Sequence, residues 1–239
     1  MGARAGRARI LVTPILLVPG LLCSSEIFAA QIPALWRFGP VTVASTLEGE
    51  RIEEAAASIL RDAPPSFALA GISMGGYLAL EIMRQAPSRV VKLALIDTSA
   101  RADTVDQTGA RLRAVAQART RFMAVGLLNL ANLLHPLRRG DAELLDILRR
   151  MVRTVGPEGY ERQQKIAMSR PDSRPFLDLV KVPTLVVVGE NDPLTPVGHS
   201  KEIASAVRGA TLKIVPDCGH LSPIEQPDRV SEALAEWIG

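Results

Sequence analysis

The chain has 239 residues, enough to bury a large core as one domain or as a core with an inserted lid. An apolar share of 47% and a charged share of 22% are ordinary for a globular protein, and no run reaches the roughly 18 uninterrupted apolar residues that a membrane span needs. Basic and aromatic residues do not interleave, so the net charge of +3 does not indicate a nucleic-acid partner.

Short apolar runs alternate with segments of helical periodicity. The runs predict strands at residues 15–18, 40–44, 67–71, 90–96, 184–188 and 211–215. The helical spacing predicts helices at residues 50–61, 75–85, 199–207 and 228–238. Residues 101–181 interrupt this alternation and indicate several helices without a strand. Strands that alternate with helices predict an α/β fold, with a mostly parallel sheet covered by helices on both faces.

The positive charge is concentrated in the segment that breaks this rhythm. Residues 101–181 carry 15 basic and 9 acidic side chains. A basic segment of this kind is compatible with acidic substrates, and also with helix faces that only meet water.

The amino-terminal segment has features of a signal peptide. Three arginines precede an apolar run over residues 10–22, and Phe28-Ala29-Ala30 resembles a cleavage site. Two prolines interrupt the run, and cleavage would remove a loop that the chemistry below needs. We therefore expect a cytoplasmic protein that keeps this segment, with export as the alternative.

The two cysteines, Cys23 and Cys218, are too few for a disulfide framework. They lie near two of the loops described below, which leaves a contact between them open. Free thiols in a reducing cytosol are the expected state.

The sequence Gly71-Ile72-Ser73-Met74-Gly75 joins the third predicted strand to the helix after it. A serine at the centre of Gly-x-Ser-x-Gly lies on a sharp strand-to-helix turn that exposes its hydroxyl at the carboxyl edge of the sheet. Glycine is needed on both sides because strand and helix pass too close there for side chains. The motif is common by chance, but here the strand before it and the helix after it supply the context that it requires.

Other polar residues also follow strands. Asp97 ends the fourth strand, Asp192 follows the fifth, and His220 follows the sixth. Because ligands collect at the carboxyl ends of parallel strands, we expect these residues at one edge of the sheet together with Ser73.

The chain resembles the α/β-hydrolase superfamily over essentially its full length. The order Ser73, Asp192, His220 matches the Ser…Asp…His order of that superfamily, and the loops around the last two resemble its acid and histidine loops. Two features depart from the pattern. The usual His-Gly after the first buried strand is Pro19-Gly20, and few residues precede that strand, so the antiparallel strands that usually come first are expected to be missing or reduced.

The resemblance implies a division of the chain. Residues 1–100 and 182–239 would form the α/β-hydrolase core, and residues 101–181 a helical lid inserted between the fourth and fifth strands. The expected catalytic groups all lie outside the lid. We therefore expect the lid to supply apolar walls and a basic group for the substrate, and to be dispensable for the reactivity of the serine.

The residue types then define a mechanism. Ser73 is the expected nucleophile, His220 the base that takes its proton, and Asp192 the acid that orients the imidazole. The oxyanion would be bound by the backbone N–H groups of Met74 and Leu21.

Each of these assignments has an alternative. Leu22 is the neighbouring candidate for the second oxyanion donor, and Asp97 is the alternative acid. His135 and His199 are expected to be surface or packing residues, because neither follows a strand. Cys23 lies in the oxyanion loop, but no recognised motif places a base beside it.

The leading hypothesis is a serine hydrolase that cleaves a small ester, thioester or lactone. A carbon–carbon bond hydrolase with the same triad is one alternative, and a weakly catalytic or non-catalytic ligand-binding module on this fold is another. The expected partner is a small ester-like molecule. No cofactor or metal is expected, and the sequence indicates no oligomeric state.

Overall fold

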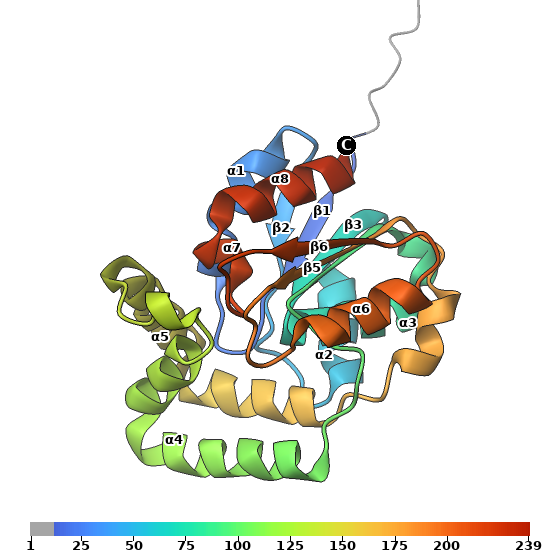
Figure 1. Ribbon diagram of the computed structural model, residues 1–239. Helices are drawn as coiled ribbons and strands as arrows, with labels where there is room; N and C mark the ends of the chain where they lie inside the picture. The colour runs from blue at the N-terminus through green and yellow to red at the C-terminus, as the bar shows by residue number, and fades with distance from the viewer. Residues whose placement is uncertain (1–11) are drawn as a thin grey trace, which may run out of the picture.

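Six strands form one sheet in the computed structural model, which describes residues 12–239 (Figure 1). The strands are β1 (Ile15–Val18), β2 (Val41–Val43), β3 (Phe67–Ile72), β4 (Val90–Ile96), β5 (Thr184–Gly189) and β6 (Thr211–Val215). Their order is β2-β1-β3-β4-β5-β6, and every neighbouring pair is parallel. The predicted α/β class with a parallel sheet is confirmed.

Helices cover both faces of this sheet (Figure 1). They are α1 (Gln31–Trp36), α2 (Ile52–Asp62), α3 (Met74–Gln85), α4 (Val105–Ala131), α5 (Ala142–Met168), α6 (Val197–Ala206), α7 (Ser222–Glu225) and α8 (Pro227–Ile238). Helices α1 and α8 pack together on one face, and α2, α3 and α6 cover the other.

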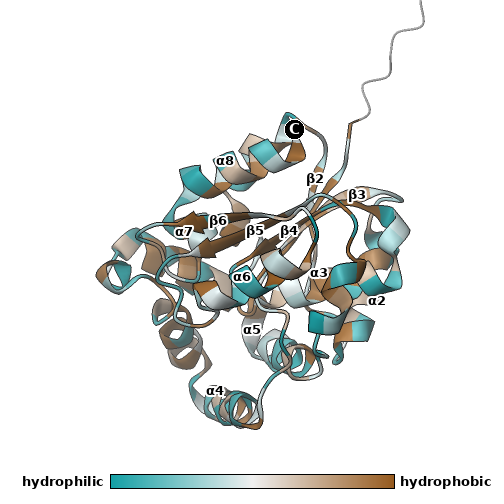
Figure 2. Ribbon diagram, turned by 45° about the vertical axis from the view of Figure 1, so that its right-hand side comes forward, coloured by the Kyte–Doolittle hydropathy of each residue, from teal (hydrophilic) through white to brown (hydrophobic). Residues whose placement is uncertain are grey.

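The inner strands β1, β3 and β5 are buried along their whole length, and β4 is buried along most of it, whereas the edge strands β2 and β6 are partly exposed. Successive side chains of a strand point to opposite sides, so the inner strands contribute to the core on both faces of the sheet. In β1, Ile15 and Leu17 join the hydrophobic cluster beneath α1 and α8, whereas Leu16 and Val18 join the cluster beneath α2, α3 and α6. All four are buried. This double burial is why β1 is a continuous apolar run in the sequence, and the inner strands β4 and β5 likewise appear hydrophobic (Figure 2).

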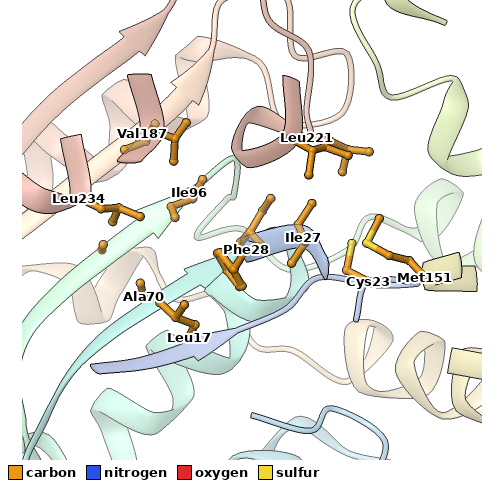
Figure 3. Close-up of a cluster of buried hydrophobic side chains, with 14 of the residues drawn as sticks. Leu17, Cys23, Ile27, Phe28, Ala70, Ile96, Met151, Val187, Leu221 and Leu234 are labelled. Carbon is orange, nitrogen blue, oxygen red and sulfur yellow. The ribbon is translucent and has the colours of Figure 1, made fainter. Parts of the chain in front are cut away.

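Helices α4 and α5 and the turn between them form the inserted segment between β4 and β5 (Figure 1). The two helices pack against each other, and each bends once, at Arg121 in α4 and at Gly156 in α5. The inserted segment docks on the core mainly through the cluster that also holds α1 and α8, and the end of α5 also joins the cluster beneath α2, α3 and α6 through Ile166 and Ala167. Within that cluster Met151 of α5 lies next to Cys23 (Figure 3).

The short elements differ most from expectation. Neither α1 nor α7 was predicted, because a helix of six or four residues is too short to show a hydrophobic period. The three amino-terminal arginines lie outside the described residues. So does most of the segment before β1, where the usual antiparallel strands were expected to be missing or reduced. Within residues 12–239, no helix is both long and apolar enough to cross a membrane.

Candidate active site

Ser73 lies on the turn between β3 and α3 with φ of 54° and ψ of −117°, a backbone conformation that residues with a side chain rarely adopt. Close contacts enforce this turn. A Cβ added to Gly71 would overlap the backbone of Gly75, and one added to Gly75 would overlap the carbonyl of Val18. The hydroxyl of Thr98 donates to the carbonyl oxygen of Ser73 at 2.7 Å. The serine is therefore held in a strained conformation from several sides.

Three side chains from three separate loops meet at this edge of the sheet. The Nε2 atom of His220 lies 2.8 Å from the Oγ atom of Ser73, and its Nδ1 atom lies 2.7 Å from the Oδ2 atom of Asp192. The ionised carboxylate of Asp192 can only accept a hydrogen bond, so the proton of the neutral imidazole is on Nδ1. The lone pair of Nε2 then faces the serine hydroxyl. The side chains of His220 and Asp192 are 1% and 0% exposed, so water does not compete for this contact.

The carboxylate of Asp192 is fixed by its own loop. Its Oδ1 atom accepts the backbone N–H groups of Leu194 and Thr195, both at 2.8 Å, and its Oδ2 atom accepts the Thr195 hydroxyl at 2.7 Å. Burial alone would raise the pKa of Asp192, but the charge of His220 and the hydrogen bonds from His220 and Thr195 lower it to about 2. Asp192 is therefore ionised at any pH at which the imidazole titrates.

The imidazole of His220 experiences two opposing effects. Burial is the largest single effect and lowers its pKa, but the charge and hydrogen bond of Asp192, together with other negative charge nearby, outweigh burial, and the net shift is upward from the usual value. Asp97 and Glu225 add further negative charge nearby. A raised pKa makes His220 a stronger base toward Ser73. His220 can accept the serine proton only while it is itself unprotonated, at a pH above its pKa.

Asp97 occupies a different position from the one expected of a triad acid. It is fully buried, and its two oxygens accept the backbone N–H groups of Gly189 at 2.9 Å and Ser222 at 3.1 Å. Burial and the charge of Asp192 raise the pKa of Asp97 to about 7. Asp97 thus connects the ends of β4 and β5 to the residues after His220, and among the described contacts it makes no hydrogen bond to the imidazole.

Two backbone N–H groups near Ser73 are free to bind an oxyanion. Among residues 12–239, neither the N–H of Leu21 nor that of Met74 donates to another protein atom, and both residues line the cavity at Ser73. The N–H of Leu22 instead donates to the Oε1 atom of Gln163 in α5 at 2.8 Å. The geometry therefore favours Leu21 over Leu22.

The inserted segment also contacts the loop that carries His220. The carbonyl oxygen of Leu133, in the turn after α4, accepts the backbone N–H of His220 at 2.9 Å. The buried carboxylate of Glu225 accepts the N–H of His135 at 2.7 Å and that of Gly219 at 3.2 Å. One carboxylate thus holds the inserted segment and the histidine loop together.

A cavity of about 60 Å³ lies at Ser73 and His220. Most of its walls are apolar side chains from the oxyanion loop, the inserted segment and the loops after β5 and β6, namely Leu21, Leu22, Leu130, Leu133, Leu194 and Leu221. Arg111 and Asn129 of α4 are its polar exceptions on the inserted segment. Larger hollows beside α8 contain none of the three side chains that meet at this edge.

The remaining candidates lie apart from this hydrogen-bonded chain. Cys23 and Cys218 are free and buried, and burial raises the pKa of Cys23 to about 12, which leaves it protonated at neutral pH. His135 caps the short helical turn after α4, and His199 lies in the first turn of α6. Within the described residues, neither histidine is hydrogen-bonded to Ser73.

Three residues that support the site were missed by the sequence analysis: Thr195, Glu225 and Gln163. Thr195 had a local signal, because an aspartate three residues before a threonine is the spacing at which the carboxylate accepts the following backbone N–H groups. Gln163 had none, since Leu22, to which it bonds, is 141 residues away in the chain.

Solved structures of known proteins share this fold. A thermophilic esterase from Thermogutta terrifontis, solved with malate bound, has a TM-score of 0.84 at 28% sequence identity over 95% of this chain and 89% of that one. The enol-lactonase from Burkholderia xenovorans LB400 has a TM-score of 0.84 at 25% identity over 99% and 94% of the two chains.

Curated sequences give the same relationship. The 3-oxoadipate enol-lactonase 2 from Acinetobacter baylyi is 26% identical over 184 residues, which cover 71% of this chain and 62% of that protein. A poly(3-hydroxyalkanoate) depolymerase from Ectopseudomonas oleovorans is 30% identical over 170 residues, which cover 70% and 59%. The chain thus spans less than two thirds of the length of these relatives.

The sequence also matches the alpha/beta hydrolase family over residues 15–233. Because that match includes all six strands and the turn at Ser73, the chain belongs to the alpha/beta hydrolase family.

Proposed function

We propose that the protein is a serine hydrolase that cleaves a small ester, thioester or lactone through an acyl-enzyme on Ser73. The observation that carries this proposal is the unbroken hydrogen-bond chain from Asp192 through His220 to Ser73, with links of 2.7 and 2.8 Å. Relatives named as esterases and enol-lactonases support an ester or lactone carbonyl as the reacting group.

In the first half of the reaction, His220 takes the proton of Ser73 as its oxygen attacks the acyl carbonyl. Asp192 stabilises the imidazolium that forms, and the N–H groups of Leu21 and Met74 bind the oxyanion. His220 then gives its proton to the departing alcohol, thiol or ring oxygen, and the tetrahedral intermediate collapses to the acyl-enzyme.

In the second half, a water molecule replaces the leaving group. His220 takes a proton from this water as it attacks the acyl carbonyl, and returns the proton to Ser73 when the acid is released. The cavity at the serine is small and mostly apolar, which favours a short acyl group next to the carbonyl.

Kinetics with p-nitrophenyl esters of increasing acyl length test the proposal. The wild type should turn over the shorter esters, and Ser73→Ala should lower kcat by about 10⁴- to 10⁶-fold with an unchanged circular dichroism spectrum. Ser205→Ala, which removes an exposed hydroxyl of α6, is the matched control and should behave as wild type. A folded wild type that turns over no ester, thioester or lactone would support the ligand-binding alternative instead.

A further inference from the structure

A second cavity adjoins the one at Ser73. It has a volume of about 110 Å³ and shares Tyr77, Arg111 and Leu194 with the first cavity. Its character differs, because Arg101 and Arg170 line it together with Arg111, and no acidic side chain of the described residues does.

The charges around this second cavity do not balance. The carboxylate of Asp103, 2% exposed, pairs with Arg111 at 2.7 Å and with Arg170 at 2.5 Å. These two arginine side chains are only 19% and 6% exposed, so two largely buried cations share a single anion. Arg101 adds no excess, because its guanidinium pairs with Glu202 at 3.0 Å. A buried charge is costly unless it is paired. One further anion in this cavity would therefore balance the charge of its two buried arginines.

Arg111 also has unused hydrogen-bond donors. A guanidinium has five N–H groups. Three of them are engaged, since Nε and Nη2 donate to Asp103 and Nη1 donates to Gln164 at 3.0 Å. Within residues 12–239 the other two have no hydrogen-bond partner, and Arg111 lines both cavities.

Other groups around the second cavity are also preorganised. Arg170 is held with its guanidinium carbon 4.2 Å from the centre of the Tyr77 ring, which fixes the plane of its donors. The Nδ1 atom of His199, which lines the cavity from α6, is buried and has no hydrogen-bond partner among the described residues.

We propose that the second cavity binds a carboxylate group of the substrate, so that the natural substrates are short esters, thioesters or lactones that carry a carboxylate away from the scissile bond. This inference rests on the proposed function at Ser73, which lies in the adjoining cavity. Arg111 would donate its two free N–H groups to the substrate carboxylate, as guanidinium groups do in bidentate pairs.

Two matched pairs of esters test the inference, one for each side of the scissile bond. Mono-p-nitrophenyl glutarate against p-nitrophenyl pentanoate places the carboxylate on the acyl side, and carboxymethyl butanoate against ethyl butanoate places it on the alcohol side. In at least one pair the wild type should have a kcat/KM at least about tenfold higher for the charged ester, since hydrogen bonds to charged groups discriminate by that much or more.

The variants locate that preference. Arg111→Gln should lower the ratio of kcat/KM between the charged and the neutral ester by about tenfold or more, and Arg111→Lys should retain part of it. Arg119→Gln on the same helix is the matched control, because Arg119 is exposed and pairs with Glu161, and its ratio should equal that of the wild type. The ratio is taken within each variant, so a loss of folded protein does not change it.

A direct binding measurement completes the test. Glutarate should bind to the wild type in calorimetry and should bind at least about tenfold more weakly to Arg111→Gln. If the esters are turned over but neither pair shows a preference, or the preference survives Arg111→Gln, the carboxylate site is wrong and the serine hydrolase stands. If no ester is turned over, the proposed function fails, and the absence of Arg111-dependent glutarate binding would then overturn the carboxylate site as well.

Discussion

The proposed reactivity of this chain depends on the surroundings of one imidazole. His220 is almost completely buried, yet its pKa is raised, because the carboxylate of Asp192, together with the charges of Asp97 and Glu225, outweighs the cost of burial. Asp97 also lies at a strand end in the sequence, but its oxygens are occupied by the backbone N–H groups of Gly189 and Ser222. The two aspartates therefore have separate tasks, one facing the imidazole and the other holding the loops.

Replacing the two aspartates should distinguish these tasks. Asp192→Asn should lower kcat for a neutral ester by about 10⁴-fold, because the amide would favour the wrong imidazole tautomer. Asp97→Asn should lower kcat by no more than about 10²-fold, the scale of a misplaced catalytic group. Steady-state kinetics of both variants checks this ranking, and a larger loss in Asp97→Asn would move the acid to Asp97.

The raised pKa of His220 predicts the pH dependence of kcat/KM. The protonated imidazole cannot accept the proton of Ser73, so activity should be low in acid and should rise to a plateau through an apparent pKa above 6.5. The charge of Asp192 raises that pKa. In Asp192→Asn, the pH at which the residual kcat/KM rises should therefore be lower than in the wild type.

Asp97, with a pKa raised to about 7, titrates in the same range and is the other group that could produce such a limb. A pH profile of Asp97→Asn separates the two, since the limb should remain if His220 is responsible. A limb below pH 6.5 in the wild type, or one that disappears in Asp97→Asn, would contradict this assignment.

At the scale of elements, the inserted segment is part of the support of the active site. The expectation that the lid is dispensable for reactivity stays a prediction, and two sets of contacts between the lid and the core argue against it. Gln163 of α5 holds the N–H of Leu22 in the oxyanion loop, and its Nε2 atom donates to the hydroxyl of Thr46 at 2.9 Å. Leu133 accepts the N–H of His220. Removal of the inserted segment would therefore loosen both loops that the mechanism uses.

Glu225 offers a test of this support that leaves the segment in place. The Oε2 atom of Glu225 accepts the N–H groups of His135 and Gly219, and its Oε1 atom accepts the N–H of Leu221 at 3.1 Å. The amide of Glu225→Gln must therefore turn its N–H₂ group toward at least one of these donors. We expect a loss of about 1–3 kcal/mol in the free energy of unfolding, the cost of an unsatisfied buried donor. The kcat should fall as well, because the backbone next to His220 would move.

Chemical denaturation and steady-state kinetics of Glu225→Gln measure both effects. Glu232→Gln on α8 is the matched control, because Glu232 is exposed, and it should leave both quantities unchanged. If Glu225→Gln loses stability and keeps the kcat of the wild type, the contact between the inserted segment and the histidine loop is structural only.

For the molecule as a whole, the sequence predicted what depends on local spacing. The strands were recognisable because most of them are short apolar runs. The candidate site was predicted from Gly-x-Ser-x-Gly at Ser73 and from the resemblance of the loops at Asp192 and His220 to those of the α/β hydrolases, since following a strand does not distinguish Asp192 from Asp97. The order β2-β1-β3-β4-β5-β6 was not predicted, because it depends on which strands pair and not on any local pattern.

Contacts between distant parts of the chain were equally inaccessible to sequence reasoning. The basic excess of residues 101–181 allowed both acidic substrates and solvated helix faces. The side chains of Arg111 and Arg170 pack around Asp103 and are largely buried. Arg119, which lies on α4 as Arg111 does, is exposed, and only this packing distinguishes the two kinds of arginine. Burial, and not charge, separates the candidate binding residues from the surface ones.

The central claim is that the acyl group of the substrate is transferred to Ser73. Intact-protein mass spectrometry after rapid acid quenching of a reaction with an activated ester tests it most directly. We predict a mass increase of one acyl group on the wild type, located by proteolysis to the peptide that contains Ser73, and no adduct on Ser73→Ala. Turnover by Ser73→Ala at the rate of the wild type, or an adduct located on another residue, would contradict the account.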